Sequence, residues 1–199
     1  MRRPIGAAFA IIAATLLAVP ATAQFSDSYK FLKAVRDRDG PKAAESLDKA
    51  GASVVNTRDY NNGETGLHVV VKRRDISWLA FLLSKGAKPD SRDNDGNTPL
   101  TLAAQIGFAE GVQMLLGQRA SVDLANDNGE TPLILAVHSR DIASVRLLLT
   151  AGASPTRQDR IAGKSAHDYA AEDPRSRAIL KVIDEAKPAK PKATMGPSL

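Results

Sequence analysis

The chain repeats a short motif at a fixed interval, and no other feature constrains its fold so strongly. The three copies read GETGLH, GNTPLT and GETPLI, and their threonines, Thr65, Thr98 and Thr131, stand 33 residues apart. A period of this length is typical of one supersecondary unit that is repeated and stacked on its neighbours. We therefore predict an elongated array of units rather than a chain wrapped around a single core.

Each copy carries the signals of two successive helices. Thr98 and Thr131 are expected to cap the first helix, because a threonine hydroxyl can accept a hydrogen bond from a free amide of the first turn. Pro99 and Pro132 follow at the first helical position, where a missing N–H group costs nothing. Further along, apolar residues at the spacing i, i+3, i+4 predict a second helix with one buried face. These residues are Leu79, Leu82 and Leu83, then Val112, Leu115 and Leu116, then Val145, Leu148 and Leu149.

The ends of the second helices differ among the three copies. Gly86 and Gly152 stand where two of these helices should end, and glycine readily takes the left-handed conformation that closes a helix. Arg119 stands at the same place in the copy between them. Because a side chain disfavours that conformation, we expect this cap to be strained or to close differently.

Period and motif together resemble the ankyrin repeat, whose unit is a β-turn followed by two antiparallel helices. The resemblance implies an all-α solenoid of about five helix-turn-helix units joined by β-turn loops. Divergent units flank the clear copies: Gly51 closes an earlier one, and residues 163–171 repeat the motif with a slip of one residue. Capping repeats at both ends of an array are expected to diverge, because they turn a polar face to water. The array is predicted over residues 24–186, with units at about 29–58, 59–92, 93–125, 126–157 and 158–186.

The first 23 residues have the three parts of a secretory signal peptide. Arg2 and Arg3 precede an apolar stretch over residues 5–19, and the small residues Ala21, Thr22 and Ala23 follow it. The apolar stretch is shorter than the roughly 20 residues that a transmembrane helix needs. We therefore predict a signal peptide over residues 1–23 rather than a membrane anchor.

A cleaved signal peptide predicts an exported protein with no stable membrane anchoring. The periplasm of a Gram-negative bacterium is the predicted location, reached by the Sec route, and secretion beyond the cell stays open as an alternative. The last residues, 187–199, are rich in lysine and proline and are predicted to form an extended, disordered tail.

The formal net charge of +5 comes from the two ends of the chain. Without the signal peptide and the three lysines of the tail, the body has 22 basic and 22 acidic residues. A protein that binds nucleic acid concentrates basic residues on its folded body, so we expect no nucleic-acid partner. The chain also has no cysteine, and its stability must therefore rest on apolar residues shared between units.

No set of residues in the sequence suits catalysis or metal binding. The chain has no cysteine nucleophile and no serine in a Gly-x-Ser-x-Gly motif. Its histidines, His68, His138 and His167, lie in three different units without partners at ligand spacing, so we predict no metal site and no cofactor. The ankyrin resemblance implies that His68 bonds backbone between adjacent turns, and His167 is expected to be partly buried by packing.

The acidic turns resemble calcium-binding loops. If Gly96 is aligned with the invariant glycine of an EF-hand loop, Ser91, Asp93 and Asp95 fall at early ligand positions. The closing glutamate would then be Leu102, which cannot bind a cation. We therefore predict ordinary β-turns, in which Asn and Asp side chains bond their own backbone.

The ankyrin resemblance implies a partner protein bound by the turn tips and by the concave face of the first helices. The variable positions at the turn tips are Asn61, Asn62, Glu64, Asn94, Asp95, Asn97, Asp127, Asn128 and Glu130. Those on the inner face are Lys72, Arg73, Gln105, Ile106, His138 and Ser139. Acidic tips beside the basic pair in the first of these units predict a polarised groove. Trp78, the only tryptophan, is expected to pack on the convex side.

The sequence therefore predicts a non-catalytic, periplasmic protein-binding scaffold that is monomeric alone. Two alternatives stay open. The protein could be an immunity or inhibitor protein that neutralises an exported toxic enzyme, or it could be an enzyme or an enzyme subunit.

Overall fold

The structure is a computed structural model and describes residues 21–186. The predicted tail and most of the predicted signal peptide lie outside these residues. None of the helices within residues 21–186 is both long and apolar enough to cross a bilayer. The elements, in order, are α1 (Ala21–Asp37), α2 (Gly40–Ala50), the 3-10 helix η1 (Ala52–Asn56), α3 (Gly66–Lys72), α4 (Ile76–Ser84), α5 (Pro99–Gln105), α6 (Ala109–Gly117), α7 (Pro132–His138), α8 (Ile142–Thr150), α9 (Ala166–Glu172), the 3-10 helix η2 (Pro174–Ser176) and α10 (Arg177–Glu185).

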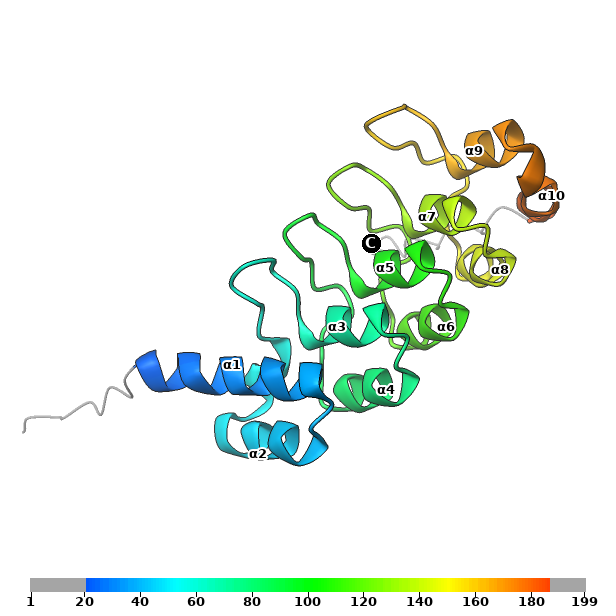
Figure 1. Cartoon of the computed structure of the whole chain (residues 1–199). Coiled ribbons are helices and arrows are strands. Elements are labelled where there is room, and N and C mark those ends of the chain that lie inside the picture. Colours follow the sequence, from blue (N-terminus) through cyan, green and yellow to red (C-terminus); the bar gives the residue numbers. More distant parts are fainter. Residues whose placement is uncertain (1–20, 187–199) are drawn as a thin grey trace, which may run out of the picture.

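The helices form antiparallel pairs that stack in one direction (Figure 1). The first helices, α1, α3, α5, α7 and α9, contact one another in that order and form one layer. The second helices α4, α6, α8 and α10 form the other layer, and the long loops that precede α3, α5, α7 and α9 project to the same side (Figure 1). Within the described chain the only β-pairing is an isolated bridge between Gln158 and Ser165. The predicted all-α repeat solenoid is confirmed.

The helices begin where the sequence places their caps. The hydroxyl oxygens of Thr98 and Thr131 accept hydrogen bonds from the amides of Thr101 and Ile134, at 3.2 and 3.3 Å. In the first clear copy His68 takes part in the cap, because its Nδ1 accepts from the Thr65 amide at 3.0 Å.

That bond fixes the role of the other imidazole nitrogen. Nε2 of His68 carries the proton and donates to the carbonyl of Asn97 in the next loop at 3.0 Å. Burial lowers the pKa of His68, so the neutral ring links two units, as the ankyrin resemblance implied.

The second helices end in the left-handed conformation in all three copies. The φ angles of Gly86 and Gly152 are 85° and 93°, and that of Arg119 is 62°. The cap at Arg119 closes as the glycine caps do, because the following amide, that of Ala120, donates to the Leu115 carbonyl at 3.1 Å. Of the two outcomes expected at Arg119, the structure shows strain and not a different closure.

One continuous core runs along the array. Equivalent leucines of successive units, Leu67, Leu100 and Leu133, are at most 1% exposed, and the repeating leucines of the second helices lie against them. Since every unit shares its apolar surface with a neighbour, stability depends on the interfaces between units as much as on the units themselves.

The one-residue slip in the last unit lies at a loop tip. The four loop tips, defined as residues 59–63, 93–96, 126–129 and 159–163, each run from an Asp or Asn to a glycine with positive φ. The two central tips contain four residues, whereas the first and the last contain five. The extra residue therefore projects into solvent and leaves the helices in register.

The turn between the two helices of a unit also contains a left-handed residue, which the sequence motif did not reveal. This residue is Arg38 (φ 59°), Arg74 (φ 56°), Gly107 (φ 61°) or Arg140 (φ 55°) in four successive units. Arginine pays a conformational cost in this region that glycine avoids. A contact of the arginine side chain must therefore offset it.

Each of these arginines reaches forward to the next unit. Arg38 donates to the carboxylate of Asp75 at 2.6 and 2.9 Å. Arg74 donates to the carbonyl of Gly107 at 2.9 Å, and its guanidinium carbon lies 5.4 Å from the ring centroid of Phe108. The arginines thus tie consecutive units together along the edge of the array where the helix pairs turn.

Candidate protein-binding surface

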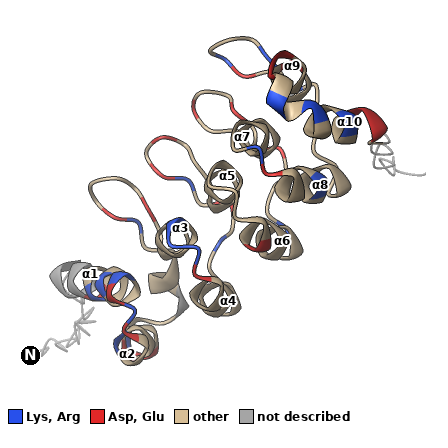
Figure 2. Cartoon of the chain, turned by 45° about the vertical axis from the view of Figure 1, so that its right-hand side comes forward, with Lys and Arg blue, Asp and Glu red and all other residues tan. Residues whose placement is uncertain are grey.

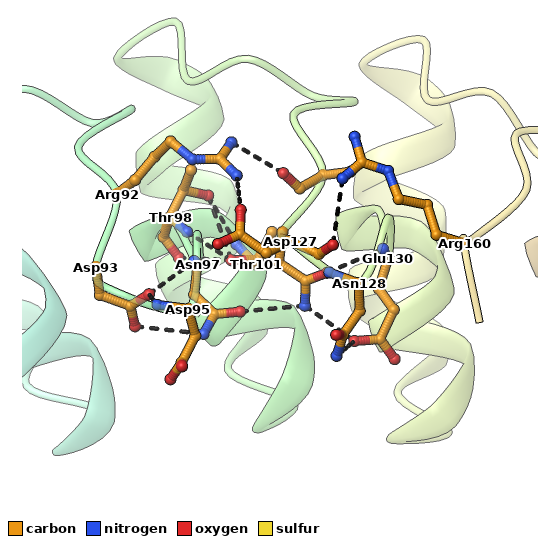
Figure 3. Close-up of polar contacts among 12 residues, drawn as sticks. Arg92, Asp93, Asp95, Asn97, Thr98, Thr101, Asp127, Asn128, Glu130 and Arg160 are labelled. Atoms are coloured by element: carbon orange, nitrogen blue, oxygen red, sulfur yellow. Dashed lines mark hydrogen bonds and ion pairs between the residues drawn. The ribbon is translucent and has the colours of Figure 1, made fainter. Parts of the chain in front are cut away.

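The loop tips are β-turns built from their own side chains. Oδ1 of Asp93 accepts from the amides of Asp95 and Asn97 at 3.0 and 2.8 Å, and Gly96 adopts a φ of 76° (Figure 3). Asn126 makes the equivalent bonds in the next loop. The Asp93 carboxylate and the Asn126 amide oxygen therefore serve turn geometry. Across residues 21–186 no three His, Asp or Glu side chains are grouped to hold a metal ion.

Hydrogen bonds join the loop tips into one row. Arg92 donates to the Asp127 carboxylate at 3.0 Å and to the carbonyl of Ala125 at 2.9 Å, so it staples its own loop to the next (Figure 3). Arg160 reaches back to the carbonyl of Asp127 at 3.3 Å. The tips are thus pre-organised, which lowers the entropy that a partner's binding would cost. The amides of Asn94, Asp127 and Arg160 also donate to the carbonyls of Asn62, Asp95 and Asn128, at 2.9, 3.1 and 2.8 Å.

Most of the predicted tip residues face solvent. Asn97 and Glu130 are half-buried, and Glu64 is only 8% exposed, with its carboxylate held by the Lys72 ammonium. Glu64 is therefore not a free contact residue, because it lies beneath the tip and pairs with the first helix. The exposed tip residues are Asn61, Asn62, Asn94, Asp95, Asp127 and Asn128.

In each unit the first inner-face residue, which is the last residue of the first helix, lies beside the residue that directly precedes the N-cap of that helix. Lys72 pairs with Glu64, and His138 Nδ1 lies 3.9 Å from Glu130 Oε1. Gln105, exposed and uncharged, has the same place in the unit between them.

In the last unit this arrangement is reversed. Lys164 precedes the cap and Glu172 ends the helix, with 2.6 Å between Lys164 Nζ and a Glu172 oxygen. The predicted polarisation of basic helices against acidic tips is thus largely neutralised within each unit, and it changes sign at the end of the array.

The second inner-face position points toward the preceding unit instead of the groove. Arg73 donates to the carbonyls of Val35 and Arg36 at 2.7 and 2.9 Å, and Ser139 donates to the carbonyl of Ala104 at 2.9 Å. Arg73, Ile106 and Ser139 are the C-cap residues of α3, α5 and α7, and all three are half-buried. Their prediction as free contact residues is corrected, because the helix ends there: the Arg73 and Ser139 side chains bond to the preceding unit, and Ile106 packs partly against the core.

A hollow of about 500 Å³ lies between the last two first helices. His138 and Tyr169 form part of its wall, with their rings edge to face and their centroids 4.4 Å apart. The Tyr169 hydroxyl donates to the Asp159 carboxylate at 2.6 Å, which raises the pKa of Tyr169 to about 12. This bond anchors the last loop to α9.

Two other side chains singled out in the sequence lie away from this surface. Trp78 is half-buried and packs edge to face on Phe81, with 5.5 Å between the ring centroids, as expected for a packing residue. His167 is half-buried, and its Nε2 lies 3.0 Å from the carboxylate of Asp184 on α10, a polar contact that the sequence did not predict. In the last unit, this polar contact between α9 and α10 takes the place of the core packing that the equivalent motif residue makes in the other units.

The exposed apolar residues on the loops are a feature that sequence reasoning missed. Tyr60, at the first loop tip, is 87% exposed, and Ile161, at the last, is 72% exposed. Both belong to the two longer tips. The signal in the sequence is the number of residues from the first Asp or Asn of a tip to its glycine, which is larger in these two tips than in the two central ones.

Charge is distributed unevenly along the array. Residues 27–92 contain 13 basic and 9 acidic side chains, and residues 93–186 contain 9 basic and 13 acidic ones. The body is neutral overall but has a net +4 in one half and a net −4 in the other; Figure 2 shows both signs distributed over many elements. The array therefore has a lengthwise electrostatic polarity that its total charge hides.

Stacked helix pairs with a row of exposed, hydrogen-bonded loops define the chain as a helical-repeat scaffold of the kind that binds other proteins. It belongs to the ankyrin repeat family, whose model, described as ankyrin repeats (3 copies), matches residues 31–126 and 67–159. Such proteins are typically non-catalytic binding scaffolds.

A single stretch of the chain also resembles a curated protein. It is 38% identical over 66 residues to oxysterol-binding protein homolog 1 of Saccharomyces cerevisiae (strain ATCC 204508 / S288c). The match covers 33% of this chain but only 5% of that protein. The chain therefore spans a small fraction of this relative's length.

Proposed function

We propose that this protein is a non-catalytic periplasmic scaffold that binds another protein across its loop tips and the ends of its first helices. The observation that carries the proposal is the row of exposed tips held rigid by Arg92, Asp127 and Arg160. A rigid polar surface loses little conformational freedom on binding, so its contacts contribute directly to affinity. The signal-peptide pattern over residues 1–23 supports the location.

The charge distribution defines the partner's orientation. With a net +4 over residues 27–92 and a net −4 over residues 93–186, the array favours a partner with acidic groups toward α1 and basic groups toward α9. Such complementarity accelerates encounter and selects register more than it adds affinity. The same neutral body supports a protein partner rather than nucleic acid. A monomeric scaffold in the partner's absence is part of the proposal.

An exported toxic enzyme is a second candidate for the partner. The exposed carboxylates of Asp95 and Asp127, at the two central tips, would complement a cleft lined by basic residues, such as that of a nuclease. In that case the protein would act as an immunity protein, and its addition would abolish the enzyme's activity at a ratio of one to one.

Site-specific crosslinking tests the proposal. A photo-reactive residue at Gln105, exposed on α5, should give one dominant protein adduct in cells. Gln113, exposed on the second helix α6 of the same unit, is the matched control and should give none. Equal labelling from both positions, or no protein adduct from Gln105, would refute binding on this face. Turnover by the pure protein that is lost in His138→Ala would instead favour an enzyme.

A further inference from the structure

Two apolar side chains stand at opposite ends of the loop row. Tyr60 is 87% exposed at the first loop tip and Ile161 is 72% exposed at the last. They are the two most exposed of the large apolar side chains within residues 27–186, and tyrosine is enriched among residues that dominate interfaces.

The exposure of these two side chains is built into the loops. Each of the two longer tips begins with an aspartate, Asp59 or Asp159. Its carboxylate accepts hydrogen bonds from the amides that follow it, and this turn directs the extra residue outward. Asp159 accepts from the amides of Ile161, Ala162 and Gly163 at 2.9, 2.7 and 3.1 Å, so the backbone beneath Ile161 is fixed. The tips thus present the side chains in a set direction.

The central tips have the opposite character. They expose Asn94 and Asp95 in one loop and Asp127 and Asn128 in the next. Along the row the surface therefore reads apolar, acidic, acidic, apolar. Arg92 pairs with the exposed Asp127 carboxylate at 3.0 Å, and an arginine, Arg58 or Arg160, lies close to each apolar residue in the sequence.

We propose that Tyr60 and Ile161 are two anchors for one folded partner protein that reaches from the first loop tip to the last. The partner has two apolar hollows, one for each anchor, and a basic surface between them that faces Asp95 and Asp127. The inference rests on the proposed binding function and adds the size and the surface pattern of the partner.

The span of the two anchors suits a folded domain. Neighbouring helices pack 8–10 Å apart, so three steps along the array separate the outer tips by about 24–30 Å. A standard interface buries about 800 Å² on each partner, which corresponds to a disc of about 30 Å across. The two anchors therefore lie near opposite edges of one interface of ordinary size.

A membrane surface fits the row less well. Asp95 and Asp127 lie between the anchors and would approach the lipid headgroups together with them. Anionic headgroups repel carboxylates and attract only the basic residues beside the anchors. A protein with a basic centre satisfies both the acidic and the apolar parts of the row.

Photo-crosslinking in the full chain tests the inference. A photo-reactive residue is placed separately at Tyr60, at Ile161, at Gln105 and at the outward-facing Gln113. The expected result is the same protein adduct from Tyr60, Ile161 and Gln105, and none from Gln113. With that protein purified, Tyr60→Ser and Ile161→Ser should each weaken binding by about tenfold or more, since burying such a side chain contributes about that much.

Exposed positions away from the loop tips provide controls. Gln113→Ser and Gln118→Ser alter exposed, uncharged residues on and just after the second helix α6 and should leave the affinity unchanged. All four substitutions concern exposed side chains, so the urea unfolding midpoint should not move and a loss of binding would not reflect misfolding.

The outcomes separate this inference from the proposed function. A protein adduct from Gln105 without the same adduct from both Tyr60 and Ile161 would overturn the two-anchor inference and leave the binding function intact. No protein adduct from any position would overturn both. If Tyr60 and Ile161 instead crosslink to lipid, the inference of a protein partner at these tips is wrong, and the tips contact a membrane surface.

Discussion

The contact between Arg38 and Asp75 allows the coupling between units to be measured. Asp75 is 6% exposed and is the N-cap of α4, where its carboxylate accepts from the Trp78 amide at 3.2 Å. The same carboxylate accepts from Arg38 of the preceding unit at 2.6 and 2.9 Å. It lies 3.5 Å from Nη2 of Arg73, a buried atom that makes no hydrogen bond within the described part of the chain. The Asp75 carboxylate therefore both caps α4 and joins two neighbouring units.

Replacing Asp75 by alanine removes three contributions to stability. Loss of the helix cap costs about 1 kcal/mol. The pair with Arg38, whose side chain is 63% exposed, contributes at most about 1 kcal/mol because water screens it. Leaving a nitrogen of Arg73 buried without its nearest anion costs about 1 kcal/mol or slightly more. We expect Asp75→Ala to lower the free energy of unfolding by about 3 kcal/mol.

The array provides a matched control two units away. Asp141 is the N-cap of α8 and accepts from the Ala143 amide at 3.2 Å, but Gly107 stands where Arg38 stands before Asp75. Asp141→Ala should therefore cost the cap, about 1 kcal/mol, and the hydrogen bond that the buried Ser144 hydroxyl donates to the same carboxylate, about 1 kcal/mol. Asp75→Ala should cost about 1 kcal/mol more than Asp141→Ala, and this difference reflects the arginine contacts across the interface.

Urea unfolding followed by circular dichroism measures both variants. Asp75→Asn retains the cap but not the charge, so its stability should lie between those of the wild type and Asp75→Ala. Burial would raise the pKa of Asp75, but the Trp78 amide and Arg38 outweigh it and lower the pKa. A lowered carboxyl pKa stabilises the folded protein above the ordinary value of 3.8, and this gain is lost as the pH falls further. Equal losses for Asp75→Ala and Asp141→Ala would refute the reasoning.

Three further substitutions test the loops and caps. Gly96→Ala should lower the free energy of unfolding by more than about 1 kcal/mol in urea, because φ is 76° and a Cβ would lie 2.2 Å from Asp127 Oδ1. Gly117→Ala is the control and should not destabilise, because a Cβ at Gly117 would meet no atom within 4 Å. Arg119→Gly should stabilise by about 1 kcal/mol because it relieves a φ of 62°, and a loss of stability would contradict this. Because burial lowers the pKa of His68, stability should fall as the pH drops below the ordinary value of 6.5, and this part of the pH dependence should be absent from His68→Gln.

The repeat architecture was predictable because its requirements are local and recur. A threonine followed by proline starts a helix by bonds made within four residues, and leucines at helical spacing bury one face. Thr98, Thr131 and the leucines of the second helices therefore stand where the structure needs them. The bond of His68 to the next loop crosses from one unit to another, and it was expected from the ankyrin resemblance rather than from a local rule.

The features that sequence reasoning missed depend on contacts between units. Arg73 was predicted to face the groove, but the end of α3 turns it toward carbonyls of α1, 37 and 38 residues earlier. Arg38 and Arg74 show no local signal, because the partners of their side chains, Asp75 and the Gly107 carbonyl, lie in the next unit. Tyr60 lies outside every motif position. Such contacts follow from how the units stack, which the spacing of the motif does not specify.

The differences between the units would fix the position of a partner along the array. Two identical units would bind the same partner group equally well, so the partner could shift by one unit at little cost. The reversed pair of Lys164 and Glu172, the lengthwise change of net charge and the two longer loop tips each occur at a defined end of the array. A partner shifted by one unit would lose an apolar anchor and meet charges of the wrong sign, which penalises incorrect registers as well as favouring the correct one. If the proposed function holds, specificity would reside in the positions where the units differ, while the regular period of the motif would maintain the rigid surface that presents them.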